Sequence, residues 1–426
     1  MRKILKKIEK KVAKSIEITN KDLEEEKVSS FLYFPFKNKE EVIIKEGDKV
    51  KVGDLLISTS WRKYFSPCSG KFEKIEKLFS LKEKKHLDYI VIENDFKYEE
   101  SKSKYKEINL DSSREDMLKR IEDFGIVGMG GGLYPLHLKY RAQKIDKVIF
   151  NAIECEPFYF KDKKILKENK QEIKIAISML EKMSLANFIY FVFKRKEKKI
   201  YKEYKEVFKE NKKVIVKKLR GSYPLGWERV IIRKLLKKEY DLYPSEINIA
   251  VNNIETLLNM EKAFKGEKIT RRNIRIFQEE TGKYFSLEVL NGTRLDLVLE
   301  FLKIDQNKDY LLLLHGPFTS SYLKDIKTPI DESISNIMIL KKLSTRIKEE
   351  CLRCGKCILK CPSGLNPIEI NEAFLNNDIS YLKKSNISKC CECGVCSFVC
   401  PSNIENSENI IKAKKYLEIL NKRGSK

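Results

Sequence analysis

The middle of the chain alternates between helix-like and strand-like patterns of apolar residues. Apolar positions recur at helical spacing over residues 164–183 and 198–210, whereas residues 188–193 and 213–216 are short apolar runs of strand length. Strands that alternate with helices in this way predict an α/β core.

The N-terminal region has the shorter periodicity of β structure. Residues 42–57 alternate around two Gly-Asp pairs, and residues 66–72 and the apolar run 89–92 follow at hairpin spacing. This pattern predicts a small barrel-sandwich hybrid of the biotinyl- or lipoyl-carrier type. Lys63 would then lie at a hairpin tip, where carrier domains of this type are modified.

The last third of the chain has two further patterns. Residues 275–302 predict short strands around Gly282-Lys283 and Asn291-Gly292. Apolar residues then recur at helical spacing over residues 367–384, and the pattern repeats over residues 406–422 after an Asn/Ser start that can cap a helix. A β region followed by a small helical region is therefore expected.

Length and composition fit a multidomain protein with buried cores. The chain has 426 residues, of which 42% are apolar and 35% charged, and this length suits roughly two to four domains. It has no apolar run of the roughly 18 residues that a membrane-spanning helix needs. Residues 1–30 lack the apolar block and cleavage site of a secretory signal. These features predict a protein that stays in the cytosol.

The formal charge of +24 could indicate a nucleic acid, an anionic membrane surface or merely solvated lysine-rich faces. Only 16 of the 86 basic residues are Arg, although the planar fork of Arg is preferred for recognising phosphate and guanine. We therefore expect no nucleic-acid partner. The basic segment 1–16 is apolar at Ile4, Leu5, Ile8, Val12 and Ile16 and is either a solvated helix, which we favour, or a membrane-surface helix.

Cysteine is concentrated near the C-terminus. Nine of the 11 cysteines fall between Cys351 and Cys400, and such clustering in a chain without an export signal indicates metal ligation rather than disulfides. The spacing C-x2-C-x2-C-x3-C-P occurs twice, at Cys351, Cys354, Cys357 and Cys361 and again at Cys390, Cys393, Cys396 and Cys400.

This spacing suits cubane iron–sulfur clusters, because three thiolates wrap one cubane while the fourth points toward a second cluster. We predict two [4Fe-4S] clusters with crossed ligation, one held by Cys351, Cys354, Cys357 and Cys400 and the other by Cys390, Cys393, Cys396 and Cys361. Structural zinc is the alternative, but it normally needs two C-x2-C hooks separated by a longer insert. Two adjacent cubanes usually transfer electrons, and a buried structural cluster is the other use.

Other residues near the cysteine motifs have supporting roles. Nearby lysines would partly compensate the negative charge of oxidised clusters, namely Lys356, Lys360 and Lys389. The cysteines outside the spacing are expected to be packing residues, namely Cys68, Cys155 and Cys391.

A glycine-rich loop over residues 124–139 holds Gly125, Gly128, Gly130, Gly131 and Gly132. Such density lets backbone N–H groups approach a phosphate or a flat ring without interference from Cβ atoms. The loop is not a dinucleotide fingerprint, since its last position is a leucine and it follows a helix-like stretch rather than a strand.

Three downstream segments place polar residues where an apolar run ends. The strand-like run from Lys147 ends in Asn151, Glu154, Cys155 and Glu156, the segment 223–228 reads YPLGWE, and residues 249–257 read IAVNNIETL. Ordinary turns or caps would explain each one alone. Together they suggest a ligand site at the strand ends of an α/β sheet.

These four segments, in this order, resemble the flavin- and NADH-binding module of the RnfC-like family of Rnf electron-transport complexes, which is related to the flavin-bearing subunit of respiratory complex I. The resemblance covers roughly residue 34 to the C-terminus. It implies that FMN is surrounded by Gly130, Gly131, Lys139, Asn151, Glu154, Asn252, Asn253 and Thr256, and that the nicotinamide nucleotide meets Glu156 and Tyr134. Gly128, Gly226 and Glu228 complete the expected set of cofactor-binding residues.

The chain departs from the family pattern at several positions. The loop has Gly132 for Ala, Leu133 for Gly, Tyr134 for Phe and Leu136 for Thr, and Trp227 replaces the second Gly of Y-P-x-G-G-E. A positive φ at Leu133 would require the loop to shift. Trp227 would fill part of the pocket or stack on a ring. His315-Gly316-Pro317 matches the family's G-G-P only in part.

The resemblance implies a multidomain fold of α/β and α+β type. Its expected parts are a basic N-terminal extension (1–30), an unmodified barrel-sandwich hybrid (31–100), a complex I-type flavin/NADH α/β domain (112–265), a small β-grasp, SLBB-like domain (266–340) and a helical ferredoxin-type domain with two clusters (341–426).

The function implied is that of an NADH-dependent oxidoreductase subunit. NADH would reduce FMN, which would release single electrons to the clusters. The implied location is the cytoplasmic face of the membrane, as a peripheral subunit with the other subunits of an Rnf-type complex and a ferredoxin or flavoprotein as partners. The alternatives are a soluble, cobalamin-reductase-like flavin/iron–sulfur protein and a non-catalytic electron relay with a degenerate nucleotide pocket.

Overall fold

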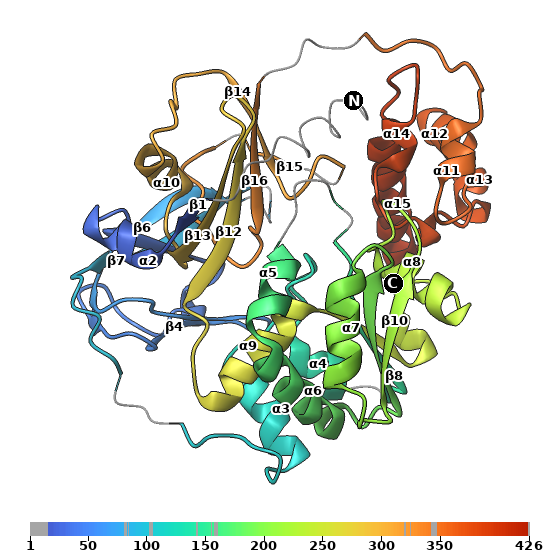
Figure 1. The fold of residues 1–426 in the computed structure, drawn as a ribbon. Helices are drawn as coiled ribbons and strands as arrows, with labels where there is room; N and C mark the ends of the chain where they lie inside the picture. The colour runs from blue at the N-terminus through green and yellow to red at the C-terminus, as the bar shows by residue number, and fades with distance from the viewer. Residues whose placement is uncertain are drawn as a thin grey trace.

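The computed structural model describes residues 16–80, 83, 85–101, 105–141, 144–154, 156, 161–318, 321–323, 325–341 and 347–424. A mixed α/β architecture results, with a parallel α/β region, two β regions and a group of C-terminal helices (Figure 1). Within the part described, no helix is long and apolar enough to cross a membrane.

The α/β region is built on a parallel sheet with strand order β10-β9-β8-β11. Its strands are β8 (Lys147–Ala152), β9 (Phe188–Lys194), β10 (Val214–Leu219) and β11 (Ile249–Asn253). Apolar side chains point to both faces, as at Phe191 on one side and Val192 on the other, which are both fully buried. Burial on both faces explains why these strands are short, nearly continuous apolar runs.

Helices cover both faces of this sheet, and the predicted alternation of strands and helices is confirmed. They are α3 (Arg114–Asp123), α4 (Leu136–Arg141), α5 (Lys161–Glu168), α6 (Lys170–Ser184), α7 (Lys198–Val207), α8 (Glu228–Leu236) and α9 (Ile254–Lys265). The single helix predicted over 164–183 is two helices, because the chain leaves helical geometry at Asn169, with φ −119° and ψ 43°.

The N-terminal β region has the expected hairpins. β2 (Phe31–Phe36), β7 (Lys85–Asn94), β6 (Gly70–Ser80) and β3 (Lys49–Val50) form an antiparallel sheet in that order, and β4 (Leu55–Ser58) pairs with β5 (Lys63–Phe65). Cys68 is fully buried in the core between them, as predicted for a packing residue.

The second β region is a six-stranded sheet with order β1-β13-β12-β16-β14-β15. Its elements are β1 (Ile16–Ile18), α2 (Asn20–Glu25), β12 (Arg271–Gln278), β13 (Lys283–Leu290), α10 (Leu295–Phe301), β14 (Tyr310–Leu314), β15 (Ser321–Tyr322) and β16 (Asn336–Lys341).

Two details of this region differ from the expectation. Residues 16–30 join this sheet instead of extending from the fold, because β1 pairs with β13 and Leu23 is fully buried in the same core. Residues 295–301 form a helix rather than a strand, since Leu295, Val298 and Leu299 bury one helical face. Of the basic segment 1–16, for which a solvated helix is favoured over a membrane-surface helix, residues 1–15 lie outside the described residues and Ile16 begins β1.

The C-terminal helices pack around their own small core. They are α11 (Lys356–Lys360), α12 (Pro367–Leu375), α13 (Ile379–Lys384), α14 (Val395–Phe398) and α15 (Asn406–Gly424). Asn366 caps α12 by accepting a hydrogen bond from the Glu369 N–H, and Asp378 caps α13. Ile370, Leu382 and Ala413 lie in the buried core. Figure 1 shows this group beside α8 at one end of the α/β region.

Candidate functional site

The polar residues singled out from the sequence meet at the carboxyl ends of β8 and β11. These strands are parallel neighbours, and Asn151 of β8 lies opposite Asn253 of β11 in the register. Asn252 precedes it at the same strand end. Carboxyl ends of adjacent parallel strands are where α/β sheets bind ligands.

The glycine loop lies over these strand ends. The Met129 N–H donates to the Thr256 hydroxyl oxygen at 2.9 Å, and the Gly128 N–H closes the loop by donating to the Tyr134 carbonyl at 2.9 Å. A Cβ at Gly130 would lie 3.8 Å from the Asn253 Cβ, whereas a Cβ at Gly131 would meet no described atom within 4 Å. One face of the loop therefore packs on the strand ends and the other is open.

Leu133, at a position where the family pattern has glycine, adopts a left-handed backbone conformation. Its φ is +47°, which costs a leucine roughly 1–2 kcal/mol. The side chain is only 4% exposed and packs with Val127 and Met129. Burial of this side chain offsets the backbone cost, so the loop keeps its turn despite the substitution.

Lys139 and Glu228 are two partly buried side chains of opposite charge at the site. The Lys139 ammonium donates to the Val251 carbonyl at 2.8 Å and to Asn252 Oδ1 at 3.0 Å. Burial lowers the pKa of Lys139, and Glu228 acts in the opposite direction. Burial likewise raises the pKa of Glu228. The charge of Lys139 and a hydrogen bond from the Tyr240 hydroxyl, 3.1 Å away, act to lower that pKa. In both groups the effect of desolvation on the pKa is larger than the effect of the opposite charge.

The YPLGWE segment is tied to β8 through Asn151. The Asn151 amide donates to the Gly226 carbonyl at 2.7 Å and its oxygen accepts from the Ile153 N–H at 2.9 Å. Trp227 is the N-cap residue of α8 and packs against the apolar cluster that contains Leu225. The large side chain of Trp227, where the family pattern has glycine, therefore packs against the apolar core beneath the segment.

Glu156 contacts a loop from the six-stranded region. The Phe318 N–H donates to Glu156 Oε1 at 3.2 Å, and a Cβ at Gly316 would lie 2.3 Å from the Glu156 Cγ. Glu154 is partly buried just before it. Cys155 and Pro157 lie outside the described residues. Sequence reasoning did not identify Phe318, although the partial match at residues 315–317 marked the neighbouring turn.

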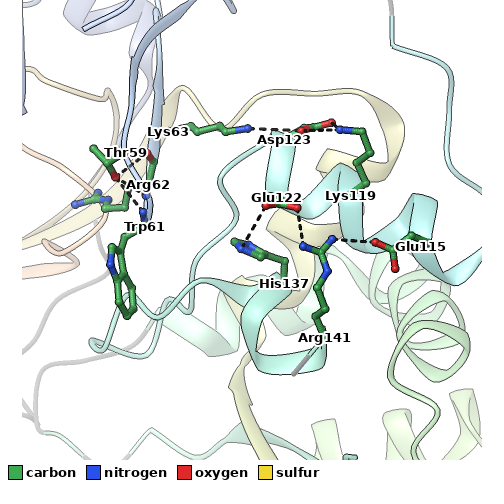
Figure 2. Close-up of polar contacts among 10 residues, drawn as sticks. All are labelled: Thr59, Trp61, Arg62, Lys63, Glu115, Lys119, Glu122, Asp123, His137 and Arg141. Carbon is green, nitrogen blue, oxygen red and sulfur yellow. Dashed lines mark hydrogen bonds and ion pairs between the residues drawn. The ribbon is translucent and has the colours of Figure 1, made fainter. Parts of the chain in front are cut away.

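Tyr134 lies at the edge of the glycine loop and is 45% exposed. Its ring meets that of Trp61 edge to face, with centroids 5.8 Å apart. Trp61 comes from the β4–β5 hairpin, and Figure 2 shows Lys63 of the same hairpin reaching Asp123 of α3, at 3.6 Å. The hairpin tip therefore contacts both the glycine loop and α3.

A cavity of about 460 Å³ lies between the N-terminal β region and the six-stranded region, on the Trp61 side of the site. It is lined by Tyr33, Trp61, Arg62, Tyr64 and Asp331 among others, and by no residue of the glycine loop. Arg62 and Glu332, which both line the cavity, form an ion pair. The polar strand ends, rather than this cavity, collect the residues expected to bind cofactors.

The first cysteine set lines a small hollow in the C-terminal region. Cys351, Cys354, Cys357 and Cys400 face it together, although Cys400 belongs to the second motif. Burial raises the pKa of the Cys357 thiol, and the nearby thiols of Cys400 and Cys351 raise it further.

The second set of cysteines likewise combines residues of both motifs. Burial raises the pKa of Cys396 to about 12, with further increases from Cys390 and from Cys361 of the first motif. Cys393 is buried, whereas Cys351 and Cys354 are exposed. Cys357 of the first set is as buried as Cys393, so the two sets differ in that the first contains two exposed cysteines and the second none.

The two motifs have matching backbone conformations. Gly355 and Gly394 follow the second cysteine of each motif with φ of +70° and +71°. The Leu365 N–H donates to Cys361 Sγ and the Ile404 N–H to Cys400 Sγ, both at 3.4 Å. N–H···S bonds of this kind stabilise thiolates that hold iron and tune cluster potential.

The comparisons with known proteins agree with this geometry. Residues 121–262 match Complex1_51K, the Nuo51 FMN-binding domain. The chain is 26% identical over 346 residues to the C subunit of the proton-translocating ferredoxin:NAD(+) oxidoreductase complex of Clostridium ljungdahlii, covering 76% of this chain and 73% of that protein. The predicted resemblance to the RnfC-like family is confirmed.

A second relative is the C subunit of the ion-translocating oxidoreductase complex of Rhodobacter capsulatus, at 25% identity over 62% of this chain and 53% of that protein. The chain thus matches about half the length of this relative. A crystal structure of an NAD+-reducing [NiFe]-hydrogenase in the air-oxidized state overlaps 64% of this chain and 54% of that chain, with 15% identity and a TM-score of 0.48.

Proposed function

We propose that this protein is the electron-transfer subunit of an Rnf-type complex, which passes electrons between NADH, FMN and two [4Fe-4S] clusters. The proposal rests on the presence of two features in one chain. A glycine loop lies over the carboxyl ends of β8 and β11, and cysteines of both motifs line one hollow. The match to the Nuo51 FMN-binding domain supports the flavin.

The residues at the strand ends fit an FMN molecule. The open face of Gly131 and Gly132 leaves room for a flat ring or a phosphate, and Lys139 supplies a positive charge held at Asn252. Bound FMN would accept two electrons from a nicotinamide and release them singly. Asn151 and Thr256 would orient the site by holding the YPLGWE segment and the glycine loop in place.

The cysteines suit cubanes better than single zinc ions. Thiolates around one zinc lie roughly 3.8 Å apart, as follows from a Zn–S bond of about 2.3 Å and tetrahedral geometry. The spacing C-x2-C-x2-C-x3-C-P also lacks the longer insert that normally separates the two hooks of a zinc site. Each thiolate of a cubane bonds a different iron, so its four cysteines are spaced more widely.

Glu156 is our candidate for recognition of NADH. A carboxylate at a strand end can accept hydrogen bonds from ribose hydroxyls or from the nicotinamide amide. In the structure it accepts from the Phe318 N–H, so a nucleotide that uses Glu156 must compete with this contact. The same contact is the observation that favours the second candidate, an electron relay that does not bind nucleotide.

The partners we propose are the other subunits of an Rnf-type membrane complex, with ferredoxin or a flavoprotein as the electron partner. The chain would then be a peripheral subunit on the cytoplasmic face of the membrane. Both relatives are named as subunits of translocating oxidoreductase complexes, which supports this assignment.

The absorbance of anaerobically purified protein before and after addition of NADH tests the proposal. Yellow flavin together with broad cluster absorption, both bleached by NADH, is the expected result. Flavin and clusters that NADH fails to bleach, but dithionite reduces, would identify the relay. Absence of both flavin and iron from the anaerobic protein would overturn the proposal.

A further inference from the structure

The loop of residues 315–318 reaches out of the six-stranded region and contacts the nucleotide side of the candidate site. The Phe318 ring stacks on the Tyr223 ring, with centroids 4.2 Å apart and an interplanar angle of 16°. The same residue donates its N–H to Glu156. Phe318 is therefore anchored through its ring to the YPLGWE segment and through its backbone to the end of the β8 segment.

The other side of Phe318 contacts the second cysteine motif. Its ring meets Phe398 of α14 edge to face, with centroids 4.5 Å apart. Its carbonyl oxygen lies against Gly394, where a Cβ would come within 2.4 Å of it. The Tyr223 hydroxyl adds a direct bond by donating to the Cys393 carbonyl at 2.6 Å.

The two cysteine motifs differ at this contact although their backbones match. Gly355 and Gly394 occupy equivalent positions with nearly equal φ. A Cβ at Gly355 would meet no described atom within 4 Å, whereas one at Gly394 would collide with Phe318. Of the two cysteine motifs, the second is therefore the one whose glycine lies in contact with the loop of residues 315–318.

A charged contact lies beside the aromatic one. The Lys389 ammonium, one residue before Cys390, lies 3.4 Å from a carboxylate oxygen of Glu239, which follows α8. Lys414 of α15 donates to the Cys390 carbonyl at 3.2 Å and so holds that cysteine on the helix core. The second motif is therefore joined to the α/β region before Cys393, through Lys389, and at Cys393 itself, through Tyr223.

We propose that Phe318 and Tyr223 are positioning residues that seat the cluster of Cys390, Cys393, Cys396 and Cys361 against the flavin side and make it the first electron acceptor. The inference rests on the proposed function. The other set, with Cys351 and Cys354 exposed, is then the exit toward a redox partner. If bound FMN received two electrons from one hydride, the cysteines around Cys393 would hold the group that takes them singly and passes each one on toward the set with Cys351 and Cys354.

Stopped-flow absorbance of the flavin- and cluster-loaded protein after mixing with NADH separates flavin reduction from cluster reduction. We expect Phe318→Leu and Tyr223→Phe to slow cluster reduction by about tenfold or more, since small misplacements of reacting groups are costly. Phe318→Tyr, which keeps the ring, should restore the rate. Cluster reduction by dithionite, which reaches the exposed cysteines directly, should be unchanged in all three variants.

Two glycine variants form a matched pair. Gly394→Ala adds both backbone strain and a collision with Phe318, whereas Gly355→Ala adds only the strain. With rates normalised to iron content, we expect Gly394→Ala to slow flavin-to-cluster transfer more than Gly355→Ala. Equal effects of the two substitutions would contradict the proposal.

Hydrogen exchange of the same purified proteins gives a readout that does not depend on turnover. Phe318→Leu should raise exchange of the α14 amides (Val395–Phe398) and leave those of α11 (Lys356–Lys360) at the parental rate. If the parent binds flavin and iron and NADH reduces the flavin, but Phe318→Leu and Tyr223→Phe transfer electrons and exchange like the parent, the inference fails while the proposed function stands. A parent that lacks flavin and iron refutes the proposed function itself.

Discussion

The Thr256 hydroxyl accepts a hydrogen bond from the Met129 N–H at 2.9 Å and joins the start of α9 to the middle of the glycine loop. Thr256 is only 1% exposed, so the bond is shielded from water. This contact fixes the loop over β11 without using any of the N–H groups on the open side of Gly131 and Gly132.

Thr256→Val should weaken flavin binding while preserving side-chain volume. Loss of the buried acceptor leaves the Met129 N–H unpaired, which costs roughly 1–3 kcal/mol. We expect the flavin dissociation constant to rise by about tenfold, equivalent to about 1.4 kcal/mol, in titrations of the deflavinated protein. Thr256→Ser keeps the hydroxyl and should bind like the parent; equal weakening in Ser and Val would show that the methyl group, not the hydrogen bond, is what matters.

Leu133→Gly should destabilise the protein even though it removes a positive-φ leucine. Removal of the strained left-handed leucine should gain roughly 1–2 kcal/mol, but loss of a buried leucine side chain costs more, about 2–5 kcal/mol. Leu185 is the matched control, because its φ is +56° while its side chain is 68% exposed. Leu185→Gly should be neutral or stabilising, by no more than the roughly 1–2 kcal/mol that the left-handed conformation costs. Thermal unfolding of both variants decides whether burial or backbone strain dominates at position 133.

Lys268 should make stability depend on pH. Its ammonium lies over the rings of Phe124, Tyr105 and Phe65, at 3.3, 4.1 and 4.2 Å from their centroids. Burial lowers the pKa of Lys268 from 10.5 to about 7, and the charges of Lys63 and Arg120 contribute. The folded state therefore binds fewer protons than the unfolded state between these values, so stability rises with pH through that window and the cost is complete below about pH 7.

Lys268→Met should remove this cost. We expect the free energy of unfolding to rise by about 1 kcal/mol at pH 6, a value reduced for partial solvent exposure and for the favourable cation–π contacts. The gain should shrink as the pH approaches 10. Lys212→Met, at an exposed position, should show no such trend. A gain that is the same at pH 6 and pH 10 would exclude a titration of Lys268 as the cause.

Cysteine replacements test the register of the cluster ligands. Cys354→Ala and Cys393→Ala should each lose iron and the broad visible absorption of the thiolate-to-iron band. Cys391→Ala, outside the spacing, should retain both, as measured by iron analysis and absorbance of anaerobic protein. Loss of a cluster in Cys391→Ala but not in Cys390→Ala would mean that the register is shifted by one residue.

Glu156→Gln should affect NADH more than flavin. Removal of one charge-assisted hydrogen bond should raise the apparent KM for NADH by a factor of about ten, or roughly 1.4 kcal/mol, with unchanged flavin content. Trp227→Gly is the complementary test in steady-state NADH oxidation. Because Trp227 packs into the core beneath its segment, we expect this change to lower stability without increasing NADH oxidation; a gain of activity from an inactive parent would instead identify the natural chain as a relay.

Local features of the fold followed from short-range patterns. The helices near residues 114–123 and 406–424 and the strands β8 to β11 lie where periodicity predicted them, because a period of 3.6 or an apolar run reflects which side chains face the core. The helix at residues 295–301 was not predicted, since its seven residues also fit a short strand and only packing against the six-stranded sheet distinguishes the two.

The sequence by itself determined the chemistry that the chain carries: the repeated cysteine spacing, the glycine loop and the polar strand ends are all contiguous motifs. The tertiary structure decided which distant segments come into contact. Residues 16–30 complete a sheet with β13, and Phe318 lies between Tyr223 and Phe398. These partners are separated by tens to hundreds of residues, and their contacts depend on how complete domains pack, which no local pattern encodes.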